Sequence, residues 1–269
     1  MTASARGGDP RGFKPLAALL RGALPPALIV LALLGLWELA ARWHVLADAL
    51  GIEPFLVPAP TDVAEALWND RDLLADNGWI TLQEVLLGFA CAVAAGLGFA
   101  VLLHLSETLR RALYPLVVAS QTVPIIVVAP ILVVWFGFGI GPKLAIIALI
   151  CFFPITVNTL DGLRAVDPDA VKMMRSLDAG RWQRFRRLEA PSALPYAFSG
   201  AKIAVAVAVI GAVFGEWAGS DSGLGHLMLQ ASAQLLTARL FAAVVVLSLM
   251  AIALFALLSL LERRVVTWR

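Results

Sequence analysis

The 269-residue chain has little charge: Asp, Glu, Lys and Arg make up 15% of it, whereas 60% of its residues are hydrophobic. A soluble domain averages about 25% charged residues, so an ordinary water-soluble globule is excluded. The formal net charge of +2 argues against a nucleic-acid binder. Two cysteines and three histidines, with no pair at metal-ligand spacing, argue against a disulfide framework and a metal centre. We expect Cys91 and Cys151 to be small core residues.

Apolar residues instead come in long blocks without any Asp, Glu, Lys or Arg, such as Val85 to Leu105 and Leu240 to Leu261. About 17 to 25 such residues suffice for a helix to cross a bilayer. The blocks predict an all-α, polytopic membrane protein with about six transmembrane helices, at residues 22–41, 83–105, 112–138, 143–162, 196–217 and 240–261. We expect an N-terminal segment, 1–21, followed by a single membrane domain, 22–269.

The basic residues predict how these spans are oriented. With the N-terminus inside, the cytoplasmic segments hold sixteen of the twenty-one Lys and Arg residues. Cytoplasmic loops of membrane proteins carry such an excess. We therefore predict that both termini are cytoplasmic in a multi-pass protein.

The most polar stretch, residues 163–195, lies between the fourth and fifth predicted spans. Asp167-Pro168-Asp169 has the residues of a helix start, so we expect a short helix to about Leu177. A break at Asp178-Ala179-Gly180 follows, and then a second helix from Arg181 to Glu189 that ends before Pro191. This second helix carries Trp182 and Phe185 among four arginines.

Two uses of this polar segment remain open from the residues alone. It is either a solvated loop that touches anionic lipid or a docking element for a cytoplasmic partner, because aromatic and Arg residues are favoured at interface hot spots.

The stretch from Lys172 through Asp178 to Pro191 is similar in spacing to the cytoplasmic loop motif of ABC importer permeases. That motif reads Glu-Ala-Ala, three residues, Gly, nine residues, Ile-x-Leu-Pro. Further stretches support the resemblance, namely Asn158 to Leu163, Thr122-Val123-Pro124, Trp135-Phe136-Gly137 and Ser222-Gly223-Leu224-Gly225. They resemble the branch with nitrate, taurine, alkanesulfonate and thiamine-precursor permeases.

The resemblance implies a type I ABC importer permease fold, like that of methionine importers, in the bacterial inner membrane. It implies that two permease copies line the pathway, and we expect a homodimer. It also implies that a cytoplasmic ABC ATPase dimer binds ATP and Mg, and that a periplasmic or lipid-anchored binding protein delivers substrate. This chain is then a non-catalytic subunit without its own cofactor, and it has no Gly-x-x-x-x-Gly-Lys-Ser/Thr sequence. The ATPase-coupling residues implied are Asp167, Met174, Leu177, Asp178, Ala179, Gly180, Arg181, Phe185, Arg187, Leu188 and Pro191.

The loop departs from the family motif at several positions. Lys172, Met173 and Met174 replace Glu-Ala-Ala, Asp178 stands where Gly is expected, and Ala190 replaces Leu. Asp tolerates a left-handed backbone and can also cap the following helix, so we expect the break to be preserved.

Polar residues in the spans are candidates for the pathway, since such groups are costly in a membrane. The candidates are Ser120, Gln121, Thr122, Asn158, Glu216 and Trp217. Glu216 either lines the outer part of the pathway or hydrogen-bonds a neighbouring helix. Helix packing is likewise the alternative for Ser120 to Thr122 and for Asn158. We expect Glu38 and Glu84 to be interfacial.

The substrate is a softer inference. Gly215-Glu216-Trp217-Ala218-Gly219 resembles the thiamine-pyrimidine and riboflavin types, and a Trp beside a carboxylate suits a flat heterocycle. Taurine, an alkanesulfonate or nitrate is the alternative substrate. A stand-alone secondary carrier and an intramembrane enzyme are the other classes. We find neither repeated halves for the first nor a catalytic cluster for the second.

Overall fold

The structure is a computed structural model that describes residues 16–268. Every regular element in this range is a helix, so the all-α prediction is confirmed. The predicted N-terminal segment 1–21 lies mostly outside the described residues. The chain divides into two compact units, one ending at Glu65 and one beginning at Ala66, and each is described by itself.

The first unit is built on one long helix. It contains α1 (Leu16–Arg42), which includes the predicted span 22–41, then α2 (Val45–Leu50), the 3-10 turn η1 (Pro54–Leu56) and the start of α3 (Pro60–Asn69). Near the end of α1, the Glu38 carboxylate accepts hydrogen bonds from the Thr61 backbone N–H at 3.1 Å and the Thr61 hydroxyl at 2.9 Å. These bonds join the first turn of α3 to the end of α1.

The second unit holds all the other helices. They are α4 (Arg71–Leu105), α5 (Glu107–Ser120), α6 (Ile125–Phe136), α7 (Ile140–Arg164), α8 (Pro168–Ser176), α9 (Arg181–Arg184), the π-helical turn η2 (Phe185–Glu189), α10 (Ala190–Gly219), α11 (Leu224–Ala233) and α12 (Thr237–Val265). Among the described residues, α4, α7, α10 with the turns before it, and α12 are long and apolar enough to cross a membrane. The pair α5 and α6 is a fifth candidate.

Residues 112–138 do not form the one continuous helix that was predicted, because the chain bends by 101° between α5 and α6. Pro124 lies directly before α6 and has no backbone N–H to extend the preceding helix. It also disfavours helical backbone at Val123. The span therefore bends sharply before Pro124 instead of running straight.

The core of the second unit lies where α7 packs against α4 and α10. On α4 a stripe of small residues, Gly88, Ala92, Gly96 and Ala100, is buried. A Cβ added at Gly88 would lie 2.6 Å from the Ile147 Cβ, so no larger residue fits between the backbones there. Such small residues let membrane helices approach closely.

The two cysteines differ in their surroundings. Cys151 is buried, and its thiol donates to the Ala204 carbonyl at 3.2 Å, as a core residue would. The same expectation is wrong for Cys91, which lies on an exposed face of α4.

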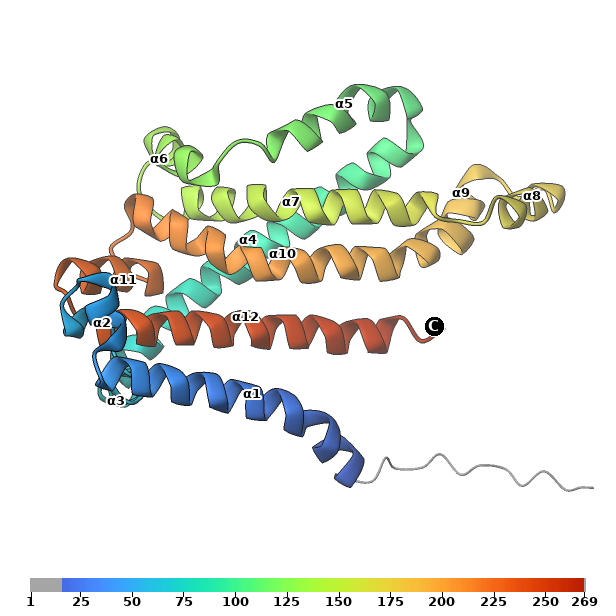
Figure 1. Cartoon of the computed structure of the whole chain (residues 1–269). Helices are drawn as coiled ribbons and strands as arrows, with labels where there is room; N and C mark the ends of the chain where they lie inside the picture. Colours follow the sequence, from blue (N-terminus) through green and yellow to red (C-terminus); the bar gives the residue numbers. More distant parts are fainter. Residues whose placement is uncertain (1–15, 269) are drawn as a thin grey trace, which may run out of the picture. The chain divides into compact units, whose positions relative to one another are not determined.

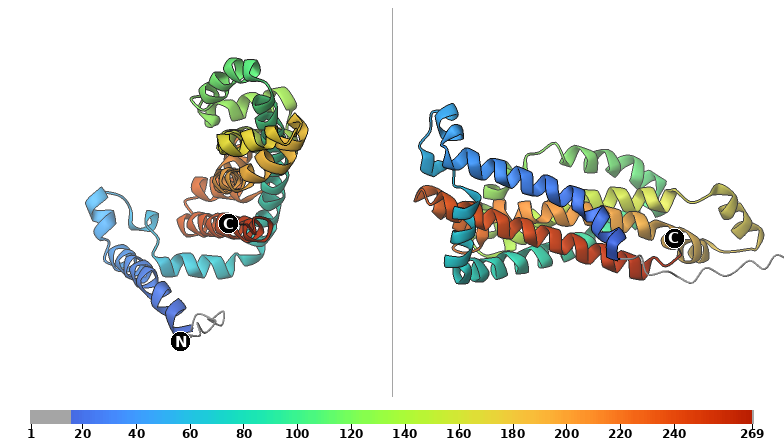
Figure 2. Two further views of the ribbon diagram at one scale, coloured as in Figure 1. Left: turned by 90° about the vertical axis from the view of Figure 1, so that its right-hand side faces the viewer. Right: turned by 60° about the horizontal axis from the view of Figure 1, so that its bottom comes forward.

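The second unit has two distinct ends. Figure 1 shows α7, α10 and α12 side by side, with α8 and α9 at one end and α11 at the other. The end-on view in Figure 2 shows α7 and α10 in the middle, with α5 and α6 on one side and α12 on the other. We call the two ends the α8 end and the α11 end.

Candidate functional site

The polar segment, residues 163–195, begins as its sequence predicts. Asp167 caps α8, because its Oδ1 accepts the Asp169 N–H at 2.8 Å, and Pro168 takes the first helical position. After α8, Asp178 has a φ of 55°, which confirms the expected left-handed backbone. The Ala179 N–H then donates to the Met174 carbonyl at 3.0 Å and closes the turn.

The helix that follows differs from the prediction in how it starts and ends. Its N-cap is Gly180, whose N–H donates to Gln183 Oε1 at 3.2 Å, so Asp178 is not its cap. It also does not end before Pro191, because α9, η2 and α10 form one helical segment of 39 residues. The Ala190 N–H bonds back to the Phe185 carbonyl, one residue further than in an α-helix. This π-turn lets the chain pass Pro191, which has no N–H to donate.

The base of the polar segment is fixed to the end of α4. The Arg181 guanidinium donates to the Leu105 carbonyl, and His104 Nε2 lies 2.8 Å from Glu189 Oε2. The Phe185 ring lies between those of Trp182 and His104, with centroid distances of 5.5 and 6.3 Å. Phe185 and Leu188 are half-buried as a result, as are Met174, Ala179 and Pro191.

The tip of the segment is open and apolar. Met173, Leu177 and Trp182 are 58%, 71% and 67% exposed, and Arg187 is exposed as well. Apolar side chains that gather on a polar surface mark an interaction site. The geometry thus combines an anchored base with a free apolar face.

The candidate pathway residues are not joined into one cluster by their hydrogen bonds. Ser120, Gln121 and Thr122 are exposed at the bend between α5 and α6, where the Ser120 hydroxyl donates to the Val117 carbonyl at 2.7 Å. Asn158 is half-buried on α7 and donates to its own helix, to the Pro154 carbonyl at 2.7 Å.

Glu216 and Trp217 lie at the α11 end. Glu216 is 1% exposed, and its carboxylate accepts hydrogen bonds from the Thr81 hydroxyl at 2.6 Å and from the Gly225 and His226 N–H groups. The Trp217 indole N–H donates to the Gly225 carbonyl at 2.9 Å. Glu216 therefore faces packed protein in this structure, and its place in a pathway stays a prediction.

An ion pair that was not predicted from the sequence lies beside Glu216. Lys143 Nζ lies 2.6 Å from Glu84 Oε1 and 2.6 Å from the Ser220 hydroxyl. Glu84 is 3% exposed, so it is enclosed by protein, and its expected depth at the membrane interface stays a prediction. The sequence did hold a sign of a polar cluster here. Thr81 and Glu84 lie three residues apart on a long apolar helix, so they share one helix face.

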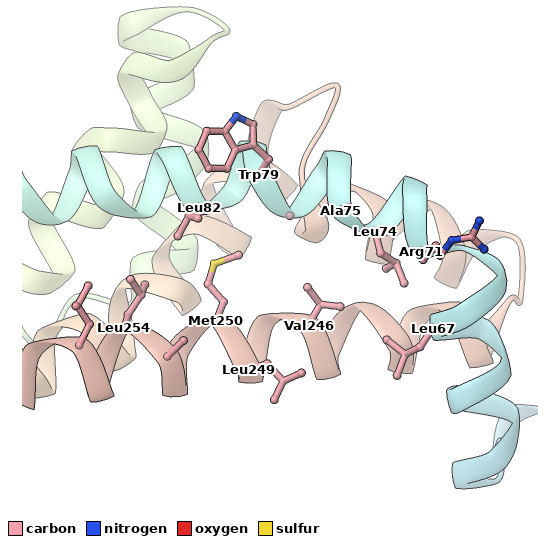
Figure 3. Close-up of a pocket in the computed structure, with 13 residues that line it drawn as sticks. Leu67, Arg71, Leu74, Ala75, Trp79, Leu82, Val246, Leu249, Met250 and Leu254 are labelled. Carbon is pink, nitrogen blue, oxygen red and sulfur yellow. The ribbon is translucent and has the colours of Figure 1, made fainter. Parts of the chain in front are cut away.

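The groove between α4 and α12 has a volume of about 660 Å³ and is almost wholly apolar. Figure 3 shows Leu74, Trp79, Val246 and Met250 along it and Arg71 at one end. A flat heterocycle with several hydrogen-bonding groups would find few partners there. The groove is therefore a poor candidate for a polar substrate.

Comparison with known proteins gives the family. The pattern described as "Binding-protein-dependent transport system inner membrane component" matches residues 88–267. The formylaminopyrimidine transport permease protein ThiX of Halalkalibacterium halodurans is 38% identical, with 92% of this chain and 96% of that protein covered. The riboflavin transport system permease protein RibX of Chloroflexus aurantiacus is 36% identical, with 84% and 85% covered.

A solved structure shares the fold. A chain of the MetNI methionine ABC transporter, solved in inward-facing conformations, superposes with a TM-score of 0.61 at 20% identity, and 74% of this chain and 97% of that chain are covered. The predicted fold of a type I importer permease is thereby confirmed. Because the family pattern covers about two thirds of the chain, and a transport permease is 38% identical over almost its whole length, the protein belongs to the binding-protein-dependent inner membrane transport components.

Proposed function

We propose that this permease forms the membrane pathway of an ATP-driven importer and couples it to a cytoplasmic ATPase through the polar segment. The observation that carries the proposal is the exposed apolar tip of that segment, with Met173, Leu177 and Trp182, on a base fixed to α4. A partner that binds the tip gains buried apolar area. The anchored base lets a movement of the partner displace whole helices.

In this proposal the α8 end faces the cytoplasm, as the positive flanking residues predict. The partner ATPase binds ATP and Mg, and closure of an ATPase pair draws two polar segments together. A binding protein delivers substrate at the α11 end. Alternating access then follows from the higher affinity of ATP for the closed state.

A second permease copy has an apolar surface to bind. Val134, Trp135 and Phe138, at and after the end of α6, are 82%, 73% and 83% exposed within this chain. In a membrane such side chains face either lipid or a neighbouring helix, so packing against a second copy is open to them. We infer that two copies meet beside α6 and that the residues at its bend, Ser120 to Thr122, line the pathway with Asn158 and Trp217. For Glu216 we infer the alternative role, a carboxyl that hydrogen-bonds neighbouring helices.

For the substrate we propose a thiamine-pyrimidine precursor or a similar flat heterocycle. The name of the relative that is 38% identical states transport of formylaminopyrimidine. The charges of this chain support a neutral cargo over an anion, because three cations of the spans already have carboxylate partners. Lys143 pairs with Glu84, Lys202 with Glu262 at 2.7 Å, and Arg239 with Asp70 at 2.6 Å.

The coupling role is tested by Trp182→Ala in the permease co-expressed with the ATPase of its operon. We expect ATPase recovery on the tagged permease to fall at least about tenfold, the effect of a hot-spot aromatic. Trp68→Ala is the matched control, because Trp68 is 70% exposed, against 67% for Trp182, but lies at the opposite side of the membrane in our topology. Equal ATPase recovery on Trp182→Ala and on wild type would reject the docking role. A wild-type permease that recovers no ATPase would favour a stand-alone carrier.

The substrate is tested by uptake into proteoliposomes that contain permease, ATPase and the cognate binding protein. We expect ATP-dependent uptake of formylaminopyrimidine and none of taurine. Uptake of taurine, an alkanesulfonate or nitrate instead would reject the heterocycle and leave the importer class standing.

A further inference from the structure

The first turn of α11 is capped by side chains from other helices. Its N-cap residue is Gly223, which has no side chain to cap the helix itself. A helix start leaves about four backbone N–H groups without partners. Here all four have partners from α4 or α10.

Each partner comes from outside α11. The Gly223 N–H donates to Asn77 Oδ1 at 2.8 Å, and the Leu224 N–H to the Thr81 hydroxyl at 2.8 Å. The next two N–H groups, of Gly225 and His226, both donate to Glu216 Oε2. A carboxylate at this position also interacts favourably with the positive end of the helix dipole.

The backbone of the turn is shaped to fit this carboxylate. Gly223 has a φ of 106°, and a Cβ there would overlap the Glu216 carboxyl group. A Cβ at Gly225 would lie 2.8 Å from Glu216 Oε2 and 2.9 Å from the Val213 Cα. Both glycines are therefore needed for the close approach.

Glu216 also lies on the long helical segment that begins at the α8 end of the second unit. Arg181 to Gly219 form one segment of 39 residues, which starts in the polar segment. At about 1.5 Å per residue, Glu189 and Glu216 are on the order of 40 Å apart. A displacement of α10 at the α8 end is thus carried to Glu216.

We propose that Glu216 is the positioning residue that ties α11 to α10, so that α11 follows the movement of α10 during transport. Thr81 ties the same turn to α4. Glu216 acts through α11 and needs no contact with substrate. The movement rests on the proposed function, whereas the capping of α11 does not.

The test uses hydrogen exchange of the full permease and ATPase turnover of its complex. Glu216→Ala leaves two buried N–H groups unpaired, so exchange in residues 223–227 should rise at least about tenfold, with α7 unchanged. Glu216→Gln keeps the shape, and its carbonyl can accept both N–H groups while its amide faces Thr81. In Glu216→Gln we expect the exchange of residues 223–227 to stay within about threefold of wild type.

Thr81→Val is the second variant, because it keeps the volume and removes only the hydroxyl. We expect a smaller rise in exchange, centred on Leu224. Thr159→Val is its matched control, since Thr159 is 5% exposed and its hydroxyl has no hydrogen-bond partner among the described residues. This control should leave exchange in residues 223–227 unchanged.

In the complex, Glu216→Ala should lower ATPase stimulation by the loaded binding protein at least about fivefold, an effect near 1 kcal/mol, while basal ATPase activity persists. Glu216→Gln should retain stimulation. Unchanged exchange in both Glu216→Ala and Thr81→Val would overturn the capping role. Lost stimulation in Glu216→Gln with normal exchange would overturn the positioning role in favour of a charge in the pathway. If wild type shows the protected turn but no stimulation at all, only the proposed function fails.

Discussion

The two ends of the second unit are built in opposite ways. At the α8 end, large apolar side chains are exposed at the tip of a polar segment, with Leu177 at 71%. At the α11 end, charged side chains are buried, with Glu216 at 1% and Glu84 at 3%. Each end therefore reverses the usual rule of apolar residues inside and charges outside.

The difference indicates where each end finds its partners. The buried carboxyl groups of the α11 end find their partners within the chain, in Thr81, Lys143 and the first turn of α11. Glu84 Oε2 is the exception, since it has no hydrogen-bond partner among the described residues. The apolar tip of the α8 end is left exposed by the described residues, and we propose that a partner covers it. The α11 end is stabilised by contacts within the chain, whereas in our proposal the α8 end is covered by a partner.

The strongest way to break the α11 end is Lys143→Met. It removes the cation from Glu84, which is buried, and should destabilise the permease by about 3 to 5 kcal/mol, as for other broken buried pairs. The melting temperature in detergent measures this loss. The double variant Lys143→Met with Glu84→Leu removes both charges and should recover most of it.

The matched change near the α8 end is Lys202→Met. The side chain of its partner Glu262 is 15% exposed, against 4% for the side chain of Glu84, so water compensates part of the loss. We expect a cost of about 1 kcal/mol, near the value for exposed pairs. Equal costs for the two lysine variants would show that the α11 end is no more dependent on its ion pair than the α8 end.

A second way to break the α11 end is Gly223→Ala. The added Cβ overlaps the Glu216 carboxyl group and also strains a φ of 106°, so we expect a cost of about 3 kcal/mol. Gly139→Ala is the control, since Gly139 has a φ of 126° but open space around its Cβ position. It should cost about 1 kcal/mol, from strain alone. Similar melting temperatures for the two variants would mean that the close approach to Glu216 contributes little.

The sequence predicted the α8 end far better than the α11 end. The start of α8 at Asp167-Pro168 and the break at Asp178 follow from local rules for helix ends. Such rules involve only neighbours along the chain. The rule that a helix ends before a proline was wrong at Pro191, because a π-turn at Phe185–Glu189 lets the helix continue past this residue.

The α11 end depends on contacts that no short window of sequence contains. Thr81 and Glu216 are 135 residues apart, and Lys143 and Glu84 are 59 apart. A single acid near a span end predicts an interfacial position, but that pattern does not show that the Glu84 side chain is enclosed by protein. Hydropathy located the spans, but it does not say which polar residues of two spans meet.

The smallest expected effect sharpens the comparison at the α8 end. Asp178 has left-handed backbone at the position where the loop motif of the family has glycine. Asp178→Gly removes the strain of a Cβ at φ 55° but adds freedom to the unfolded chain, so the net gain should be at most about 1 kcal/mol.

Local hydrogen exchange is the measurement suited to so small a gain. The Ala179 N–H, bonded to the Met174 carbonyl, reports the turn directly and should exchange up to about fivefold more slowly in Asp178→Gly. ATPase recovery should stay within about twofold of wild type, because the apolar tip at Leu177 and Trp182 is unchanged. A loss of ATPase binding with a well-protected turn would instead assign the Asp178 carboxylate to the interface, and the α8 end would then bind its partner through charge as well as through apolar area.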